Sequence, residues 1–197
     1  MHRIRSFDGM RAVVTGGSSG IGLAVSRNLS AHGASVSILA RDPIKMAQAK
    51  GSIEGASCHI ADVADLASVK EAAGSILSEG PVDLLVNSAG ISHPGRFMDT
   101  DPEVSRRTID VNLIGTMNSC HAFIPGIRTG GHIANIGSIA GILGFYGYGA
   151  YSASKFGIMG FSEALRMEMA EKGIGVSVVL PPDTRTPAGT STSWNGS

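Results

Sequence analysis

Short runs of β-branched and other apolar residues alternate with longer segments of helical periodicity along the whole chain. This alternation is typical of repeated strand–helix–strand units, whose strands lie parallel in one sheet between two layers of helices. We expect strands at residues 11–15, 35–40, 57–61, 84–87, 131–136 and 175–180. The helices between them are expected at residues 21–32, 43–53, 66–79, 102–124 and 151–172. Right-handed crossovers would give an α/β fold with a doubly wound parallel sheet in three layers.

Charge, cysteine and histidine content argue against several classes of protein. Lysine plus arginine and aspartate plus glutamate number 16 each, so a net charge of zero gives no attraction to nucleic acid. The two cysteines, Cys58 and Cys120, lack a metal-binding or paired spacing and are expected to be reduced thiols, which favours a cytoplasmic location. The six histidines are dispersed, so we expect no metal site. No apolar run approaches the roughly 20 residues that span a bilayer, which predicts no transmembrane segment in this chain.

A glycine-rich turn joins the first expected strand to the first helix. Its sequence is Thr15-Gly-Gly-Ser-Ser-Gly-Ile-Gly22. At this place in a Rossmann-type sheet, backbone N–H groups and the positive end of a helix dipole meet the pyrophosphate of a dinucleotide. An ordinary tight turn is the alternative, but the strand before and the helix after favour binding. The residues expected to bind the cofactor here are Gly16, Ser18, Ser19, Gly20, Ile21 and Gly22.

The end of the second strand predicts which dinucleotide is bound. NAD-binding proteins commonly place a carboxylate there, but this strand ends in Leu-Ala-Arg41. Arg41, helped by Lys45, can pair with a 2′-phosphate, which favours NADPH or NADP over NADH. Asp42 and Asp62 weaken this argument, and Arg41 could be a solvated surface charge.

Two residues after the third strand are also expected to contact the cofactor. Asp62 and Val63 are placed to border the adenine ring. The alternative role of Asp62 is to cap the helix that follows it.

Three side chains near the later strands form a candidate catalytic group. Tyr151 and Lys155 lie four residues apart at the start of a helix, so they share one face, and the ammonium favours the phenolate form of the tyrosine. Ser138 follows the fifth strand, at the carboxyl edge where open α/β sheets bind ligands. Such a pair is also common on ordinary helices, and Ser138 could simply cap a turn. A further small-residue turn after the fourth strand, Asn87-Ser-Ala-Gly90, is expected at the same edge.

Together these motifs resemble the short-chain dehydrogenase/reductase family, with its TGxxxGxG turn and YxxxK pair, over nearly the whole chain. The resemblance implies that Asn87, Ala89 and Gly90 pass beneath the cofactor, which Tyr151 and Lys155 also contact. It further implies a catalytic tetrad of Asn112, Ser138, Tyr151 and Lys155. In that family the asparagine holds a water near the lysine. Taken alone, Asn112 would be a helix-interior amide that makes a structural hydrogen bond.

The segment Pro181-Pro-Asp-Thr-Arg-Thr186 is similar to one branch of that family, the 3-ketodihydrosphingosine reductases. The resemblance implies that Pro181, Thr184 and Thr186 contact the cofactor. It also implies NADPH-dependent reduction of 3-ketodihydrosphingosine to dihydrosphingosine, in sphingolipid synthesis. One alternative is another ketone, such as a 3-oxoacyl thioester or a steroid-like ketone. Another is a truncated, inactive NADPH-binding protein that has kept the tetrad.

Domain organisation and assembly are the last expectations. Residues 1–187 are expected to form one dinucleotide-binding domain, and residues 188–197 a flexible tail. Family members usually continue into a substrate lid and a seventh strand, neither of which is visible here.

The helix that begins near Tyr151 carries more apolar residues than one face requires: Phe156, Met159, Phe161, Leu165, Met167 and Met169. The resemblance implies a homodimer or homotetramer formed by this helix and the one that contains Asn112.

Overall fold

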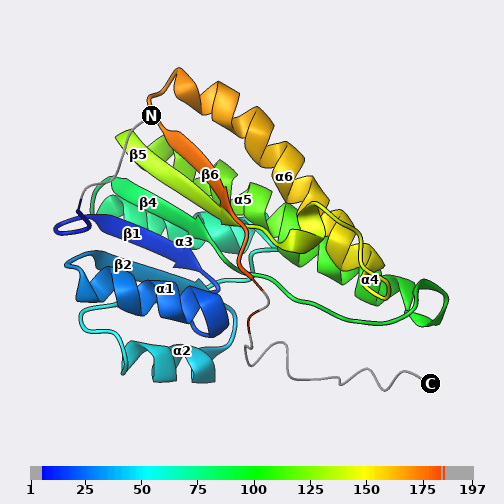
Figure 1. The fold of residues 1–197 in the computed structure, drawn as a ribbon. Coiled ribbons are helices and arrows are strands. Elements are labelled where there is room, and N and C mark those ends of the chain that lie inside the picture. The colour runs from blue at the N-terminus through cyan, green and yellow to red at the C-terminus, as the bar shows by residue number, and fades with distance from the viewer. Residues whose placement is uncertain (1–5, 183, 185–197) are drawn as a thin grey trace.

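The computed structural model describes residues 6–182 and residue 184. Six strands form one parallel sheet in the order β3-β2-β1-β4-β5-β6 (Figure 1). The strands are β1 (Arg11–Thr15), β2 (Ser35–Ala40), β3 (Ser57–Ile60), β4 (Val82–Asn87), β5 (Ile127–Ile136) and β6 (Gly175–Val179). The predicted doubly wound sheet is confirmed. Strand β5 begins earlier than expected because Ile127 pairs with Val82, before a shift in the register of the two strands.

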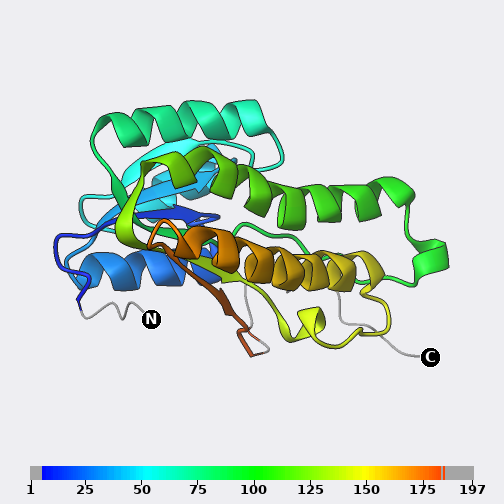
Figure 2. The ribbon, with the colours of Figure 1, turned by 90° about the horizontal axis from the view of Figure 1, so that it is seen from above.

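Helices cover both faces of the sheet (Figures 1 and 2). The α-helices are α1 (Gly20–Ala31), α2 (Pro43–Lys50), α3 (Leu66–Ser78), α4 (Pro102–Ile109), α5 (Gly115–Phe123) and α6 (Gly149–Ala170). Short 3₁₀ segments are η1 (Phe97–Asp99), η3 (Ile124–Gly126) and η4 (Ile139–Gly141). One buried apolar cluster joins the sheet to α3, α5 and α6, and the other joins the opposite face to α1 and α2. The three predicted layers are therefore present.

The helix predicted at residues 102–124 is interrupted. Between α4 and α5 lies η2 (Asp110–Ile114), a segment of π-helix with Asn112 at its centre. A π-helical turn holds an extra residue, so it changes which side chains face inward, and such turns are frequent at functional sites. Asn112 is fully buried. The sequence does not reveal this interruption because its apolar spacing is compatible with one continuous helix.

Within the described part of the chain, β3 and β6 are the two edge strands of the sheet. On the side of α1, an apolar groove of about 820 Å³ runs over β4, β5 and β6, where Leu84, Ala134 and Val179 line it. None of the described helices is long and apolar enough to cross a membrane.

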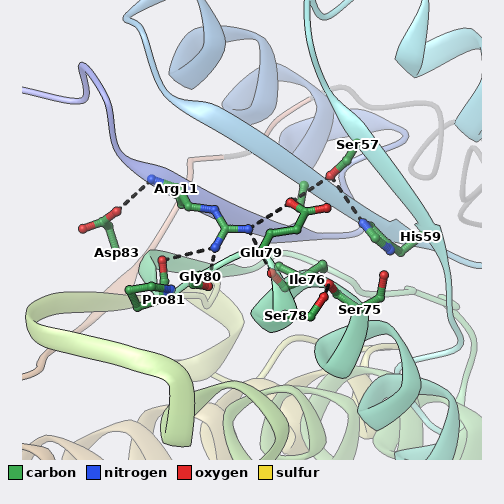
Figure 3. A network of polar contacts seen from close by, with 11 residues as sticks. Arg11, Ser57, His59, Ser75, Ile76, Ser78, Glu79, Gly80, Pro81 and Asp83 are labelled. Carbon is green, nitrogen blue, oxygen red and sulfur yellow. Dashed lines mark hydrogen bonds and ion pairs between the residues drawn. The ribbon is translucent and has the colours of Figure 1, made fainter.

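Arg11 connects the start of β1 to the end of α3 and the start of β4 (Figure 3). Its backbone N–H donates to Asp83 Oδ2 over 2.8 Å. Its guanidinium donates to the carbonyl oxygens of Ile76 (2.9 Å) and Gly80 and to Glu79 Oε2 (3.1 Å). The cation therefore binds carbonyl groups at and just beyond the C-terminal end of α3, where the helix dipole favours positive charge.

Replacing Asp83 with alanine is expected to lower the free energy of unfolding by about 2 kcal/mol, because the Arg11 N–H loses its acceptor in a partly buried position. Asp83 is only 6% exposed and also pairs with Arg128 (Nε–Oδ1, 2.8 Å). Asp99→Ala is the control, since Asp99 and its partner Arg96 are both 65% exposed and such surface pairs contribute little. Urea unfolding measures both variants. Equal losses would show that Asp83 has no special structural role.

Candidate active site

The glycine turn and the turn that follows β4 are held against each other at the carboxyl edge of the sheet. Gly16 has a φ of +68°, and a Cβ atom there would lie 2.7 Å from Ala89 Cα. Thr15 Oγ1 accepts hydrogen bonds from the backbone N–H groups of Ser88 (3.2 Å) and Ala89 (3.3 Å). Only glycine permits this backbone conformation and this close approach.

The start of α1 fits an anionic ligand. Asp42, Asp65 and Asp101 cap α2, α3 and α4 with their side chains, whereas Ser19, at the start of α1, makes no such bond. The first N–H groups of a helix have no helical acceptors, so those of α1 are available to an external anion. A Cβ atom on Gly22 would lie 2.4 Å from the carbonyl oxygen of Gly16, so glycine is also needed for the tight entry into the helix. These features fit the pyrophosphate of a dinucleotide.

The end of β2 presents a basic residue and no free carboxylate. Arg41 is exposed there. Asp42 accepts hydrogen bonds from the N–H groups of Ile44 (2.9 Å) and Lys45 (3.1 Å), so its carboxylate serves as the cap of α2. Lys45 lies in the first turn of that helix, with its Nζ 4.0 Å from Asp42 Oδ2. Asp42, one of the two aspartates that weaken the NADPH prediction, is thus engaged within the protein.

Asp62 and Val63 lie beside Arg41, just after β3. Asp62 Oδ1 accepts from the N–H of Ala64 over 3.0 Å, and Asp65, not Asp62, caps α3. The Val63 side chain is buried against Gly115, and its carbonyl oxygen accepts from Asn118 over 2.9 Å. Val63 would therefore contribute to an adenine pocket by holding the backbone after β3 in position, and not through its side chain.

Lys155 is a buried ammonium beneath the ring of Tyr151. Its Nζ donates to the carbonyl oxygen of Ile136 over 2.8 Å and lies 5.7 Å from the centroid of the Tyr151 ring. Burial lowers the pKa of Lys155 from 10.5 to about 8. The lysine therefore remains largely protonated at neutral pH and places a positive charge beside the Tyr151 ring.

The lowered pKa of Lys155 predicts how stability depends on pH. Between about pH 8 and 10.5 the unfolded chain keeps this proton while the folded chain releases it, so stability rises with pH in that window. Relative to Lys155→Met, the unaltered protein is expected to gain about 2 kcal/mol between pH 8 and pH 10. Urea unfolding of both proteins at several pH values isolates this contribution. A constant difference across the window would contradict it.

Asn112 is anchored to the neighbouring loop and to α6. Its Oδ1 accepts from the N–H of Ile91 (2.8 Å), and its Nδ2 donates to the Ile91 carbonyl oxygen and to Ser154 Oγ (both 3.0 Å). A Cβ atom on Gly90 would lie 3.3 Å from Asn112 Oδ1 and 4.0 Å from Lys155 Nζ, so the asparagine lies near the lysine. The Asn112 side chain therefore makes structural hydrogen bonds, as expected for an amide in the interior of a helix.

Ser138 follows the strand whose last carbonyl group holds Lys155. Its Oγ accepts from the N–H of Ala140 over 3.1 Å at the start of η4. That segment packs on α6, since a Cβ atom on Gly141 would lie 2.8 Å from the Lys155 carbonyl oxygen. The structure therefore places Ser138 and the Tyr151–Lys155 pair at the same edge of the sheet.

The apolar groove reaches this edge. Gly20, Ile21, Pro181 and Thr184 all line it, so predicted cofactor residues from the first turn and from the segment after β6 share one cavity. Thr186 lies outside the described residues.

The side chain of Asn87, a residue predicted to contact the cofactor, is buried in the core. Its Nδ2 donates to Asn135 Oδ1 (2.8 Å) and contacts Cys120 Sγ (3.3 Å). Asn135 Nδ2 in turn donates to Ser162 Oγ over 2.8 Å. This buried network links β4, β5, α5 and α6 beneath the site.

Sequence reasoning also missed residues that support the site. Ser154, inside the Tyr151–Lys155 motif, was not assigned its bond to Asn112, and Arg107 was not recognised as the partner of Asp62, with 2.5 Å between Nη2 and Oδ2. Because Ser154 lies on the same helix turn as Tyr151 and Lys155, the sequence offered a reason to expect it near the site. No local sequence pattern predicts the Arg107–Asp62 pair, because the two residues lie 45 positions apart.

The fold and the glycine turn define a dinucleotide-binding protein of the Rossmann type, and comparison with known proteins gives the family. A sequence model of the short chain dehydrogenases matches residues 10–195. The chain belongs to the short chain dehydrogenase family.

The similar curated proteins include reductases of two kinds of ketone. The chain is 44% identical over 186 residues to 3-dehydrosphinganine reductase TSC10A of Arabidopsis thaliana, an alignment that covers 89% of this chain and 56% of the relative. It is 39% identical over 191 residues to 3-ketodihydrosphingosine reductase of Bos taurus, with 91% and 58% covered. It is 41% identical over 174 residues to a 3-oxoacyl-[acyl-carrier-protein] reductase of Rattus norvegicus, with 85% and 72% covered. The chain thus spans little more than half the length of the sphingolipid reductases that it resembles.

Solved structures agree on the fold. An actinorhodin polyketide ketoreductase variant with NADPH has a TM-score of 0.86 at 31% identity and covers 93% of this chain and 74% of its own. A short chain dehydrogenase/reductase from Burkholderia phymatum in complex with NAD has a TM-score of 0.87 at 27% identity, with 93% and 69% covered.

Proposed function

We propose that this chain binds NADPH and reduces a ketone to a secondary alcohol, with 3-ketodihydrosphingosine as its substrate and dihydrosphingosine as its product. The observation that carries the proposal is the buried Lys155 ammonium, which lies beneath the Tyr151 ring and is bound to the end of β5. Burying a cation without a carboxylate partner costs stability, so function is a better explanation than packing for its presence.

The residues of the site have complementary roles in this reaction. The bound cofactor would supply a hydride to the carbonyl carbon. Tyr151 would give a proton to the carbonyl oxygen, and Lys155 would favour the phenolate that remains. Ser138 uses its oxygen as an acceptor toward Ala140, so its own hydroxyl hydrogen can polarise the substrate carbonyl group. Asn112 would hold the loop at Ile91 and support a water near the lysine.

The proposed cofactor contacts follow from the same edge of the sheet. The N–H groups at Ser19, Gly20 and Ile21 would hold the pyrophosphate. Arg41 and Lys45 would pair with the 2′-phosphate of NADPH, because Asp42 is engaged as a helix cap. Two solved relatives contain NADPH and NAD respectively, so the family uses both dinucleotides and the choice depends on these basic residues.

The names of the relatives and the segment after β6 support the sphingolipid ketone. Five relatives at 37–44% identity are named 3-dehydrosphinganine or 3-ketodihydrosphingosine reductases. The rat 3-oxoacyl-[acyl-carrier-protein] reductase, at 41% identity, supports a 3-oxoacyl thioester as the second candidate. The two free cysteines, Cys58 and Cys120, support the proposal of a reducing, cytoplasmic location.

NADPH oxidation by the purified chain tests the proposal. We expect faster turnover with 3-ketodihydrosphingosine than with a 3-oxoacyl thioester, and faster turnover with NADPH than with NADH. The reverse substrate preference would support the thioester reductase. NADPH binding without turnover of either ketone would instead support an inactive binding protein.

We also propose that two copies pair through α6 and the helix around Asn112. Leu165 and Met169 of α6 are buried in the core, but Phe156 is 46% exposed and Met167 is 73% exposed. Ile114, in η2, is 38% exposed. Light scattering is expected to show a dimer or tetramer and Phe156→Glu a smaller species. A monomeric unaltered chain would refute this assembly.

A further inference from the structure

Asp62 and Arg41 lie next to each other where the adenosine half of a dinucleotide would bind. Strands β2 and β3 are paired with Ala40 opposite Ile60, and the N–H of Ala61 donates to the Ala40 carbonyl oxygen over 3.1 Å. Arg41 directly follows Ala40 at the end of β2, and Asp62 directly follows Ala61. A carboxylate therefore stands beside the basic residue proposed to hold the 2′-phosphate.

A free carboxylate in that position would oppose binding of a 2′-phosphate in two ways. It would repel the phosphate directly, and it would compete for the guanidinium of Arg41. The Asp62 side chain is 34% exposed, so solvent weakens this effect without removing it.

Arg107 neutralises this carboxylate from another part of the chain. It lies on α4, and its Nη2 is 2.5 Å from Asp62 Oδ2, while Oδ1 of the same carboxylate accepts from the N–H of Ala64 over 3.0 Å. Both oxygen atoms of Asp62 are thus engaged within the protein. Burial raises the pKa of Asp62, but the bonds from Arg107 and Ala64 and the charges of Arg107 and Arg41 outweigh it, so the pKa is lowered and the pair is ionic at neutral pH.

We propose that Arg107 is a specificity-determining residue, which lets the site accept a dinucleotide with a 2′-phosphate by pairing with Asp62 and leaving Arg41 available. The inference rests on the proposed function, because it assumes that a dinucleotide binds at this edge. Arg107 is therefore expected to increase the affinity for NADP and to have little effect on the affinity for NAD, since only NADP carries the additional phosphate charge.

Dissociation constants for NADP⁺ and NAD⁺, measured by isothermal titration calorimetry without substrate, test this role. Arg107→Gln is expected to weaken NADP⁺ binding by about tenfold and to change NAD⁺ binding little. The double variant Asp62→Asn with Arg107→Gln is expected to recover the NADP⁺ affinity, because the unpaired carboxylate is gone. The matched control is Arg106→Gln on the same helix, where Arg106 pairs with Glu103 at 3.1 Å and both side chains are largely exposed. This control is expected to leave both constants unchanged.

The outcomes separate this inference from the proposed function. If the unaltered chain prefers NADP⁺ and Arg107→Gln weakens both dinucleotides equally, or if the double variant shows no recovery, Arg107 is only structural and the inference is overturned. If the unaltered chain prefers NAD⁺, the NADPH proposal fails and the role of Arg107 fails with it. Circular dichroism and thermal unfolding of each variant distinguish a local effect on binding from a loss of folding.

Discussion

Replacing Tyr151 with phenylalanine is expected to lower kcat for ketone reduction by about 100-fold or more, because general acid catalysis by a positioned side chain contributes that much. The substitution removes one hydroxyl group and keeps the ring above Lys155 Nζ. Dinucleotide binding and the free energy of unfolding are therefore expected to change little. Initial rates of NADPH oxidation at saturating ketone, together with calorimetric dissociation constants, measure the two effects separately.

Tyr148→Phe is the matched control for this prediction. The rings of Tyr148 and Tyr151 make an edge-to-face contact with their centroids 6.0 Å apart, so the control also removes a tyrosine hydroxyl from the start of α6. We expect it to keep most of the activity, because Tyr151 alone lies over the buried ammonium. Equal losses in the two variants, or near-normal turnover by Tyr151→Phe, would show that Tyr151 is not the proton donor.

Replacing Gly22 with alanine is expected to destabilise the protein by about 3 kcal/mol and to weaken dinucleotide binding by more than tenfold. The added Cβ atom would lie 2.4 Å from the carbonyl oxygen of Gly16, and a backbone atom cannot move aside as a flexible side chain can. The turn and the start of α1 must shift, which displaces the N–H groups proposed to hold the pyrophosphate. Urea unfolding and calorimetric titration with NADP⁺ measure the two losses.

Gly74→Ala provides the opposite result as a control. Gly74 lies within α3, and a Cβ atom there would meet nothing within 4 Å. Alanine favours a helix over glycine, so this variant is expected to gain about 0.5–1 kcal/mol of stability and to bind NADP⁺ normally. If Gly22→Ala behaved like Gly74→Ala, the glycine turn would not be the constrained entry that the geometry indicates.

The sequence alone determined the order of the elements and the residues at the carboxyl ends of the strands. Local periodicity and turn chemistry are short-range properties, so they predicted the start of β1 at Arg11, the parallel sheet and the positions of Gly16, Ser138 and Tyr151 relative to its edge. The family follows from the same motifs, because they are short segments at fixed places in the fold.

Only the tertiary structure decided how distant residues act on one another. It buried Lys155 against the carbonyl group of Ile136, which lowers the pKa of the lysine, and it engaged Asn112 in a π-helical turn. It also placed Arg107 on Asp62. These partners lie 19 or more positions apart, and their pairing depends on how helices pack on the sheet. No local sequence pattern records that packing, because burial and charge proximity arise only when the layers are assembled.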